Sequence, residues 1–92
     1  MSGIPEKIRL EIVTPSRSVL IEDVDEVTVP GSLGCLGILP GHRPLLSTLG
    51  LGEVAYRQGA RWHHLACFWG FVEVLPDKVI ILADVAERAG YI

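Results

Sequence analysis

The chain has 92 residues, 49% of them hydrophobic, and a formal net charge of −3. A chain of this length can bury only one small core, so the sequence predicts a single domain over residues 1–92. The acidic balance and the scattered basic residues give no general attraction to phosphate backbones and exclude nucleic acid as an expected partner. So high a hydrophobic fraction in a small chain indicates surface covered by other proteins.

The chain contains no signal for the membrane or for secretion. No run approaches the roughly 20 apolar residues of a membrane helix, and the N-terminus lacks an apolar core with a cleavage-like site. We therefore expect no membrane insertion and a cytosolic location. Cys35 and Cys67 lie far apart in sequence without a ligand cluster, so we expect two buried, reduced thiols.

The first third of the chain reads as three strands. Residues 8–13 alternate between apolar and polar or smaller side chains, which predicts a strand with one buried face. Residues 18–21 form a short apolar run, and residues 24–29 place Val27 and Val29 on one face.

Residues 27–46 contain four of the ten glycines and three of the six prolines, a composition that excludes a helix. We expect a shaped loop with a brief strand at residues 35–39. The side chains in this segment are mostly apolar, whereas a loop that only connects strands is normally polar. This mismatch indicates a surface that contacts a partner.

The remainder of the chain reads as two hairpins and a short helical end. Leu45, Leu46 and Leu49 are expected to return to the core. Residues 53–57 should pair with residues 61–67 across a turn at Gly59, with Trp62 beside Val54 or Tyr56. Residues 71–75 and 79–83 should form a second hairpin, the most buried one, across residues 76–78. Residues 84–90 have helical character, enough for one or two turns.

Short strands separated by Gly, Pro and Asp predict an all-β sandwich or barrel. The candidate chemistry within it is weak. His63 and His64 should point to opposite faces of a strand, and His42 has no carboxylate nearby in sequence to orient it. Residues 31–34 lack the Lys-Ser/Thr ending of a phosphate loop. We expect no catalytic, cofactor-binding or metal-binding residues.

Two other functions stay open at this point. One is a small β-barrel metal-binding protein or enzyme that uses Cys35 and His42, with His63 as a third candidate. The other is an unrelated adaptor sandwich. Core packing is the commonest explanation for the run of Phe68, Trp69, Gly70 and Phe71. Because neighbours on a strand alternate, at least one of Phe68 and Trp69 should nevertheless face outward, where an aromatic side chain suits a protein interface.

Two runs together resemble the N-terminal β-sandwich domain of the epsilon subunit of F-type ATP synthases, called delta in mitochondria: VDEVTVPGSLGCLGILPGHRPLLSTL and GFVEVLPDKVIILADVAER. The resemblance extends from about Ile8 to Arg88. It implies a sandwich of two antiparallel five-stranded sheets, about ten short strands, with at most a short helical turn at the C-terminus.

The resemblance also implies a function. The chain would be a noncatalytic rotor subunit of the central stalk that binds the gamma subunit and the c-ring and couples ion-driven rotation to ATP synthesis, with no cofactor. It would lie at the cytoplasmic face of the bacterial inner membrane or the equivalent side of an organelle membrane. The expected partner-interface residues are Ser32, Leu33, Cys35, Leu36, Pro40, Gly41, His42, Ser47, Phe68 and Trp69.

This sequence departs from the family pattern at three places. The family commonly has acidic residues at the positions of Leu33 and Cys35, and Ser-Gly-Gly where this chain has Phe68, Trp69 and Gly70. In most bacterial members two C-terminal helices follow the sandwich and carry inhibition and, in some cases, ATP binding. The sequence given ends at Ile92, so neither activity is assigned.

Overall fold

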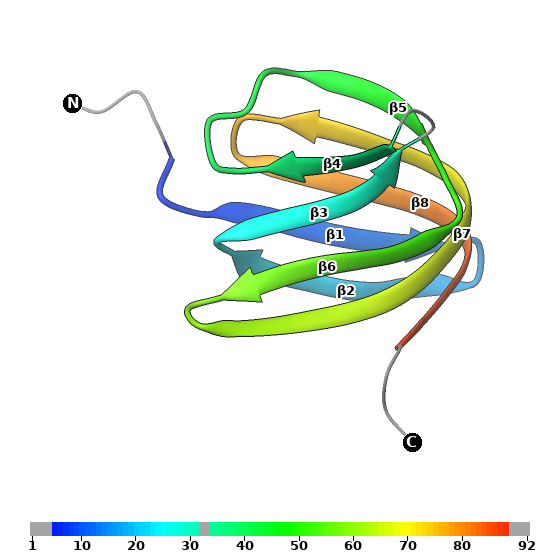
Figure 1. The fold of residues 1–92 in the computed structure, drawn as a ribbon. Coiled ribbons are helices and arrows are strands. Elements are labelled where there is room, and N and C mark those ends of the chain that lie inside the picture. Colours follow the sequence, from blue (N-terminus) through cyan, green and yellow to red (C-terminus); the bar gives the residue numbers. More distant parts are fainter. Residues whose placement is uncertain (1–4, 32–33, 89–92) are drawn as a thin grey trace.

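A computed structural model describes residues 5–31 and 34–88 (Figure 1). Within these ranges the chain forms eight strands and no helix, which confirms the all-β class. The strands are β1 (Ile8–Thr14), β2 (Arg17–Val24), β3 (Glu26–Gly31), β4 (Gly34–Ile38), β5 (Leu45–Leu49), β6 (Gly52–Gln58), β7 (Arg61–Leu75) and β8 (Lys78–Arg88).

The strands follow the order β2-β1-β8-β7-β5-β3-β4, and β6 pairs with both β3 and β7. Every pair is antiparallel except β1 and β8, which run parallel. The expectation of purely antiparallel sheets is therefore wrong at this one contact. Parallel pairing is possible there because most of the chain, and not a tight turn, connects the two strands.

β7 and β8 pass through both layers of the sandwich. The first half of β7 pairs with β6 as far as the pair of Cys67 and Gly52. Its second half pairs with β5, starting at the pair of Gly70 and Leu49. β8 pairs with β7 from the pair of Leu75 and Lys78 to the pair of Leu65 and Arg88. One layer is thus β2-β1-β8-β7-β5 and the other is β4-β3-β6-β7-β8. The chain therefore has eight strands where about ten shorter ones were expected, because β7 and β8 each belong to both layers.

β7 changes its inward face where it passes from one layer to the other. Cys67 is buried, but strict alternation would next bury Trp69 and Phe71, which are 65% and 53% exposed. Burial resumes one residue later at Val72. Trp69 has φ = 59°, so the strand turns over at this residue. We call this bend of β7, together with the facing residues 50–51 and 84–85, the corner; such bends commonly join the layers of a sandwich.

The corner is packed so tightly that one position accepts only glycine. A Cβ added at Gly70 would overlap the carbonyl oxygen of Leu82 and lie 2.8 Å from the carbonyl carbon of Leu82 and 2.9 Å from Cα of Ala83. The backbones of β7 and β8 approach each other there without an intervening side chain.

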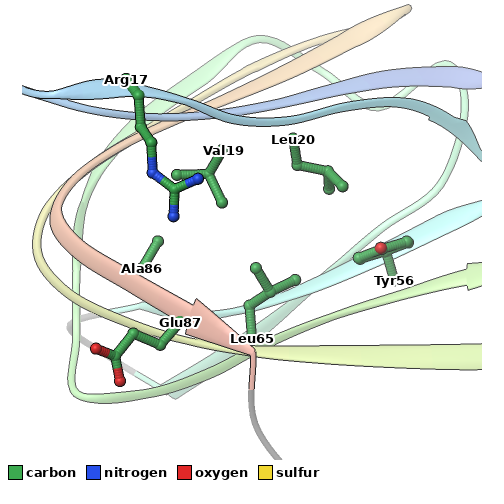
Figure 2. Close-up of a pocket in the computed structure, with 7 residues that line it drawn as sticks. All are labelled: Arg17, Val19, Leu20, Tyr56, Leu65, Ala86 and Glu87. Atoms are coloured by element: carbon green, nitrogen blue, oxygen red, sulfur yellow. The ribbon is translucent and has the colours of Figure 1, made fainter.

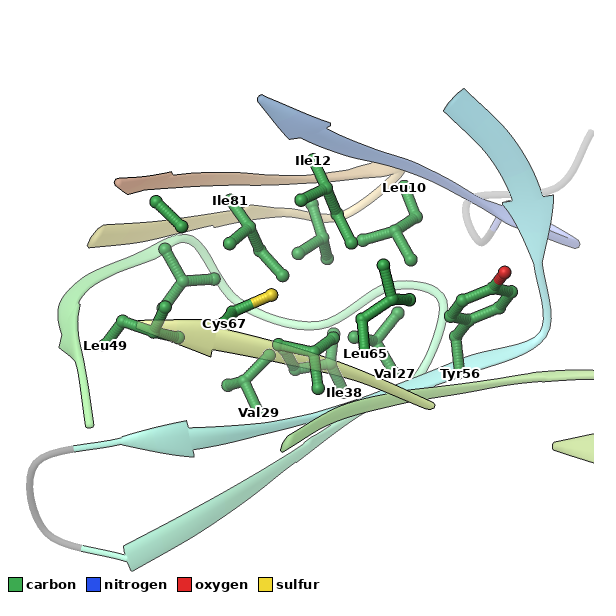
Figure 3. Packing of buried hydrophobic residues seen from close by; sticks show 14 of the residues in the cluster. Leu10, Ile12, Val27, Val29, Ile38, Leu49, Tyr56, Leu65, Cys67 and Ile81 are labelled. Carbon is green, nitrogen blue, oxygen red and sulfur yellow. The ribbon is translucent and has the colours of Figure 1, made fainter. Parts of the chain in front are cut away.

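The core lies between the two layers and is entirely apolar among the described residues (Figure 3). Ile8, Leu10 and Ile12 show the alternation that the sequence predicted for β1. Leu49 is buried as expected, whereas Leu45 and Leu46 are 38% and 70% exposed, so their placement in the core was wrong. The fully buried large side chains are Ile8, Leu10, Ile12, Ile38, Ile81, Val24, Val27, Val29, Val54, Val72, Val74 and Val79.

Both predicted hairpins are present. Gln58 faces Arg61 across a turn in which Gly59 has φ = 64°, and Leu75 faces Lys78. Within the first hairpin Trp62 faces Arg57, so its expected pairing with Val54 or Tyr56 was wrong.

The predicted helical end is not a helix over its described part. Residues 84–88 belong to β8, and their pairing with β7 continues to the pair of Leu65 and Arg88. A capping signal in a short segment is weak, and the backbone of β7 satisfies the groups that a helix turn would have satisfied. Residues 89–90 lie outside the described part of the chain.

Candidate protein–protein interface

The turn that carries His42 is shaped by its sequence and held by the neighbouring hairpin. The amide of His42 donates to the carbonyl of Leu39 at 3.1 Å, with Pro40 and Gly41 at the central positions. Gly41 has φ = 89°, as the third residue of a type II turn requires. Its own amide donates to the carbonyl of Pro76 at 2.8 Å, which fixes the turn to the β7–β8 hairpin.

His42 is half-buried, and its Nδ1 donates to the carbonyl oxygen of Arg43 at 2.7 Å. The ring is therefore oriented by its own loop, and no carboxylate contact that would prepare it as a base is found among the described residues. This geometry suits a contact residue better than a catalytic one.

β4 forms one edge of the sheet. Cys35 is exposed on it, so the expectation that this thiol is buried was wrong, while Cys67 is fully buried in the core. Burial raises the pKa of the Cys67 thiol to about 11. Leu36 is half-buried against the core. Ser32 and Leu33, the other two predicted contacts of this segment, lie outside the described residues.

Of the two neighbouring aromatic residues at the corner, one faces outward, as predicted. Phe68 is half-buried, and Trp69 is 65% exposed. Opposite them, Gly50 donates its amide to the carbonyl of Pro30 and fits closely against Gly31. The corner thus lies beside the β3–β4 hairpin end.

The predicted contacts do not form one compact patch. Trp69 lies at the corner, and the turn at residues 39–42 lies at the opposite end of β4, beside the β7–β8 turn (Figure 1). β4 connects the two ends. Ser47 is half-buried on β5, faces the buried Val72 across the pair, and bonds the carbonyl of Thr48 at 3.1 Å.

An exposed apolar surface that the sequence reading missed lies on the outer face of β5, β7 and β8. Leu46, Phe71 and Leu82 are 70%, 53% and 51% exposed, and we call them the outer patch. Phe71 faces Leu82 directly across the strand pair, and Leu82 faces Val13 of β1. Apolar side chains that adjoin across strands in this way are typical of a surface covered by another protein.

A signal for the outer patch was present in the sequence. Residues 79–83 are apolar without interruption, although only Val79, Ile81 and Ala83 are buried. A strand that is apolar on both faces indicates cover on both faces. The same run had predicted only a strongly buried strand.

A groove of about 630 Å³ lies between β2 on one side and β6, the first half of β7 and the end of β8 on the other (Figure 2). Its described walls carry one guanidinium, one carboxylate and one phenol among apolar side chains. They do not supply the set of nucleophile, base and orienting group that a catalytic pocket needs. The lining residues are Arg17, Val19, Leu20, Tyr56, Leu65, Ala86 and Glu87.

The histidines on β7 face opposite ways, as predicted. His63 stacks on Tyr56 with ring centroids 4.9 Å apart, while Nδ1 of His64 lies 3.3 Å from Oε1 of Glu53. Among the described residues, no three His, Cys, Asp or Glu side chains gather as a metal would require.

One electrostatic cluster ties Asp25, between β2 and β3, to the β6–β7 turn. The Asp25 carboxylate accepts the amide of Gly59 at 2.7 Å and pairs with Nζ of Lys7 at 2.6 Å. These contacts, the bond from Gly59 first, hold the pKa of Asp25 below its ordinary value.

The sequence pattern of one protein family, "ATP synthase, Delta/Epsilon chain, beta-sandwich domain", matches residues 7–89. The chain belongs to this family. It is 53% identical over 87 residues to "ATP synthase epsilon chain 1" of Syntrophotalea carbinolica, which covers 95% of this chain and 63% of that relative. It is 48% identical over 84 residues to "ATP synthase epsilon chain" of Geobacter metallireducens, and this alignment covers 91% of this chain and 61% of that relative.

Solved structures share the fold. A chain in the cryo-EM structure of the Euglena gracilis mitochondrial ATP synthase (OSCP/F1/c-ring in rotational state 1) superposes with a TM-score of 0.88 at 24% identity, over 95% of this chain and 56% of that one. A chain in the central stalk and c-ring structure of the Tetrahymena thermophila mitochondrial ATP synthase superposes with a TM-score of 0.75 at 18% identity. The superposition covers 89% of this chain and 66% of that one.

The chain spans less than two thirds of the length of these epsilon-chain relatives. Within residues 5–31 and 34–88 no helix has the length and apolar character needed to cross a bilayer.

Proposed function

We propose that this domain is a noncatalytic part of the central stalk of an F-type ATP synthase, where it binds the gamma subunit and the c-ring and couples ion-driven rotation to ATP synthesis. The observation that carries the proposal is the family match over residues 7–89. The complex would place the domain at the cytoplasmic face of a bacterial inner membrane or the equivalent side of an organelle membrane.

The geometry suits a part that transmits force. The turn at residues 39–42 is fixed to the β7–β8 hairpin by the bond from Gly41 to Pro76, and β7 and β8 belong to both layers. A contact made at this turn is therefore connected directly to the whole sandwich. A contact surface that is rigid before binding loses little conformational entropy when it binds.

Two surfaces are proposed for two partners. The turn with Pro40, Gly41 and His42, together with β4, would face the c-ring and the adjoining part of gamma. The outer patch and Trp69 offer the large exposed apolar side chains that are enriched at protein interfaces, and we assign them to gamma. Ser32, Leu33, Ser47 and Phe68 remain proposed contacts at the margins of these surfaces.

The proposal is tested by titrating the domain into purified gamma subunit in a calorimeter. We expect saturable binding of one domain per gamma. Phe71→Ser should weaken this binding at least about tenfold, because it removes a central apolar side chain of the outer patch.

The matched control is Trp62→Ser. Trp62 is 44% exposed on the outer side of the other layer, so its removal should leave gamma binding unchanged. Absence of binding by a folded wild-type domain would contradict the function. Equal loss in both variants would contradict only the assignment of the outer patch.

The turn is tested separately with His42→Asp. His42 is held by Arg43 of its own loop, so the sandwich should stay folded while association with the c-ring weakens. Unimpaired coupled ATP synthesis by complexes that contain this variant would contradict the c-ring assignment.

A further inference from the structure

β2 and β4 are the two edge strands of the sheet, and they differ in how their open edges are protected against pairing with other strands. At β2 the edge carries charged side chains, and the side-chain Nε2 of Gln58 donates to the Glu22 carboxylate at 3.2 Å and to the backbone carbonyl of Asp23 at 3.0 Å. At β4 the residues are Gly34, Cys35, Leu36, Gly37 and Ile38, without charge or proline. Proteins commonly guard exposed edges with charges, prolines or bulges, because an open edge pairs with other strands.

The backbone groups that β4 presents outward can be identified from its partner strand. Pro30 has no amide hydrogen, and its carbonyl accepts the amide of Gly50 on the far side of β3. Pro30 faces Cys35, so their pair is not hydrogen-bonded, and the amide and carbonyl of Cys35 point to the open edge. The groups of Gly37, two residues further, point the same way.

These groups are complementary to those of a second copy. We propose that two copies of this chain associate through their β4 edges as an antiparallel pair in which Cys35 of each copy bonds Gly37 of the other. This register uses all four outward backbone groups of each copy.

The side chains fit the same register. Cys35 faces a glycine, Ile38 faces Gly34, and only Leu36 faces itself, on the two-fold axis. Gly34 and Gly37 have open space where a Cβ would be, so the large residues opposite them meet no obstacle from their own copy. No charge lies at the contact to repel the second copy. This association is a property of the free domain and does not depend on the proposed stalk function.

Association is tested by sedimentation equilibrium of the purified chain from about 10 µM to about 1 mM, since a short edge makes few bonds and a weak dimer. We expect the fraction of the chain present as dimer to rise with concentration. Cys35→Lys should be monomeric throughout, because a lysine on an edge strand opposes pairing. Thr48→Lys places the same charge on the exposed outer face of β5 and should dimerise like wild type.

A second variant tests the hydrogen-bond pattern itself. Gly37→Pro removes an amide that points away from β3, so the domain should keep its circular dichroism spectrum and lose only the dimer. A wild-type chain that stays monomeric at the highest concentration overturns the proposal. Unchanged dimerisation of Cys35→Lys and Gly37→Pro overturns it as well.

Cross-linking tests the register. Across the proposed axis the two Leu36 Cα atoms form a non-hydrogen-bonded pair about 4.5 Å apart, which is within the range for a disulfide. Leu36→Cys in a Cys35→Ser background should therefore give a covalent dimer under mild oxidation, while Thr48→Cys in the same background should not. Cys67 is buried and does not compete. Equal cross-linking of the two variants would refute the register.

Discussion

Gly70 shows how much the corner depends on a single missing side chain. A Cβ at this residue would overlap the carbonyl oxygen of Leu82, which belongs to the backbone and cannot turn aside. We expect Gly70→Ala to lower the free energy of unfolding by at least about 2 kcal/mol, measured by urea denaturation. Gly37→Ala is the control: it meets nothing within 4 Å and should change stability by less than about 0.5 kcal/mol.

Asp25 predicts a pH dependence. Its pKa is lowered in the folded state from the ordinary 3.8, so the ionised carboxylate stabilises the fold above that value. The contribution is lost as the pH falls through the lowered folded pKa. Asp25→Asn should therefore melt below wild type at pH 7, and the gap should narrow as the pH falls below about 4. A gap in melting temperature that stays constant down to pH 2 would contradict this assignment.

At the level of elements, the corner has an unusual residue. Trp69 has φ = 59°, a conformation that costs a non-glycine residue roughly 1–2 kcal/mol, and its ring is mostly exposed. We expect Trp69→Gly to keep the urea midpoint of wild type or raise it. Phe68→Gly removes a half-buried ring from a residue without positive φ and should lower stability by about 2 kcal/mol. Equal losses in the two variants would show that the backbone at Trp69 is unstrained.

The sequence predicted elements whose signals are local. The alternation in β1, the glycine turn before β7 and the Pro-Asp turn before β8 were all correct, because each depends on neighbouring residues. The end of β8 was missed because Asp84 and Glu87 form a local capping pattern that pairing with β7 overrides. The parallel contact of β1 with β8 joins residues far apart in sequence, and periodicity carries no information about it.

Prediction of the candidate interface was limited in the same way. The apolar, proline-rich segment before β5 pointed to a contact surface, but the outer patch combines Leu46, Phe71 and Leu82 from three strands. The pairing registers place Phe71 opposite Leu82, while Leu46 faces Glu73 and lies diagonally from Phe71 on the same face. The family resemblance implied Ser-Gly-Gly at the positions of Phe68, Trp69 and Gly70. The positive φ at Trp69 is a physical reason for a glycine at position 69.

At the scale of the molecule, β8 lies between β1 and β7 in one layer and continues into the other. Ile81 is fully buried at its centre, so Ile81→Ala should cost about 2–5 kcal/mol. The loss should appear at the same urea concentration in tryptophan fluorescence, which reports the β6–β7 layer and the corner, and in circular dichroism. Separate midpoints would mean that the layers unfold independently.

Shared strands also determine how the backbone opens to solvent. Because β7 and β8 cross from one layer to the other, neither layer can detach without breaking pairs in both. Local opening is therefore restricted to the ends and edges. We expect the amide hydrogens of residues 72–74 and 79–81 to exchange with deuterium only when the whole domain unfolds, at a rate set by global stability. A small domain with this behaviour moves as one body when one end is pushed.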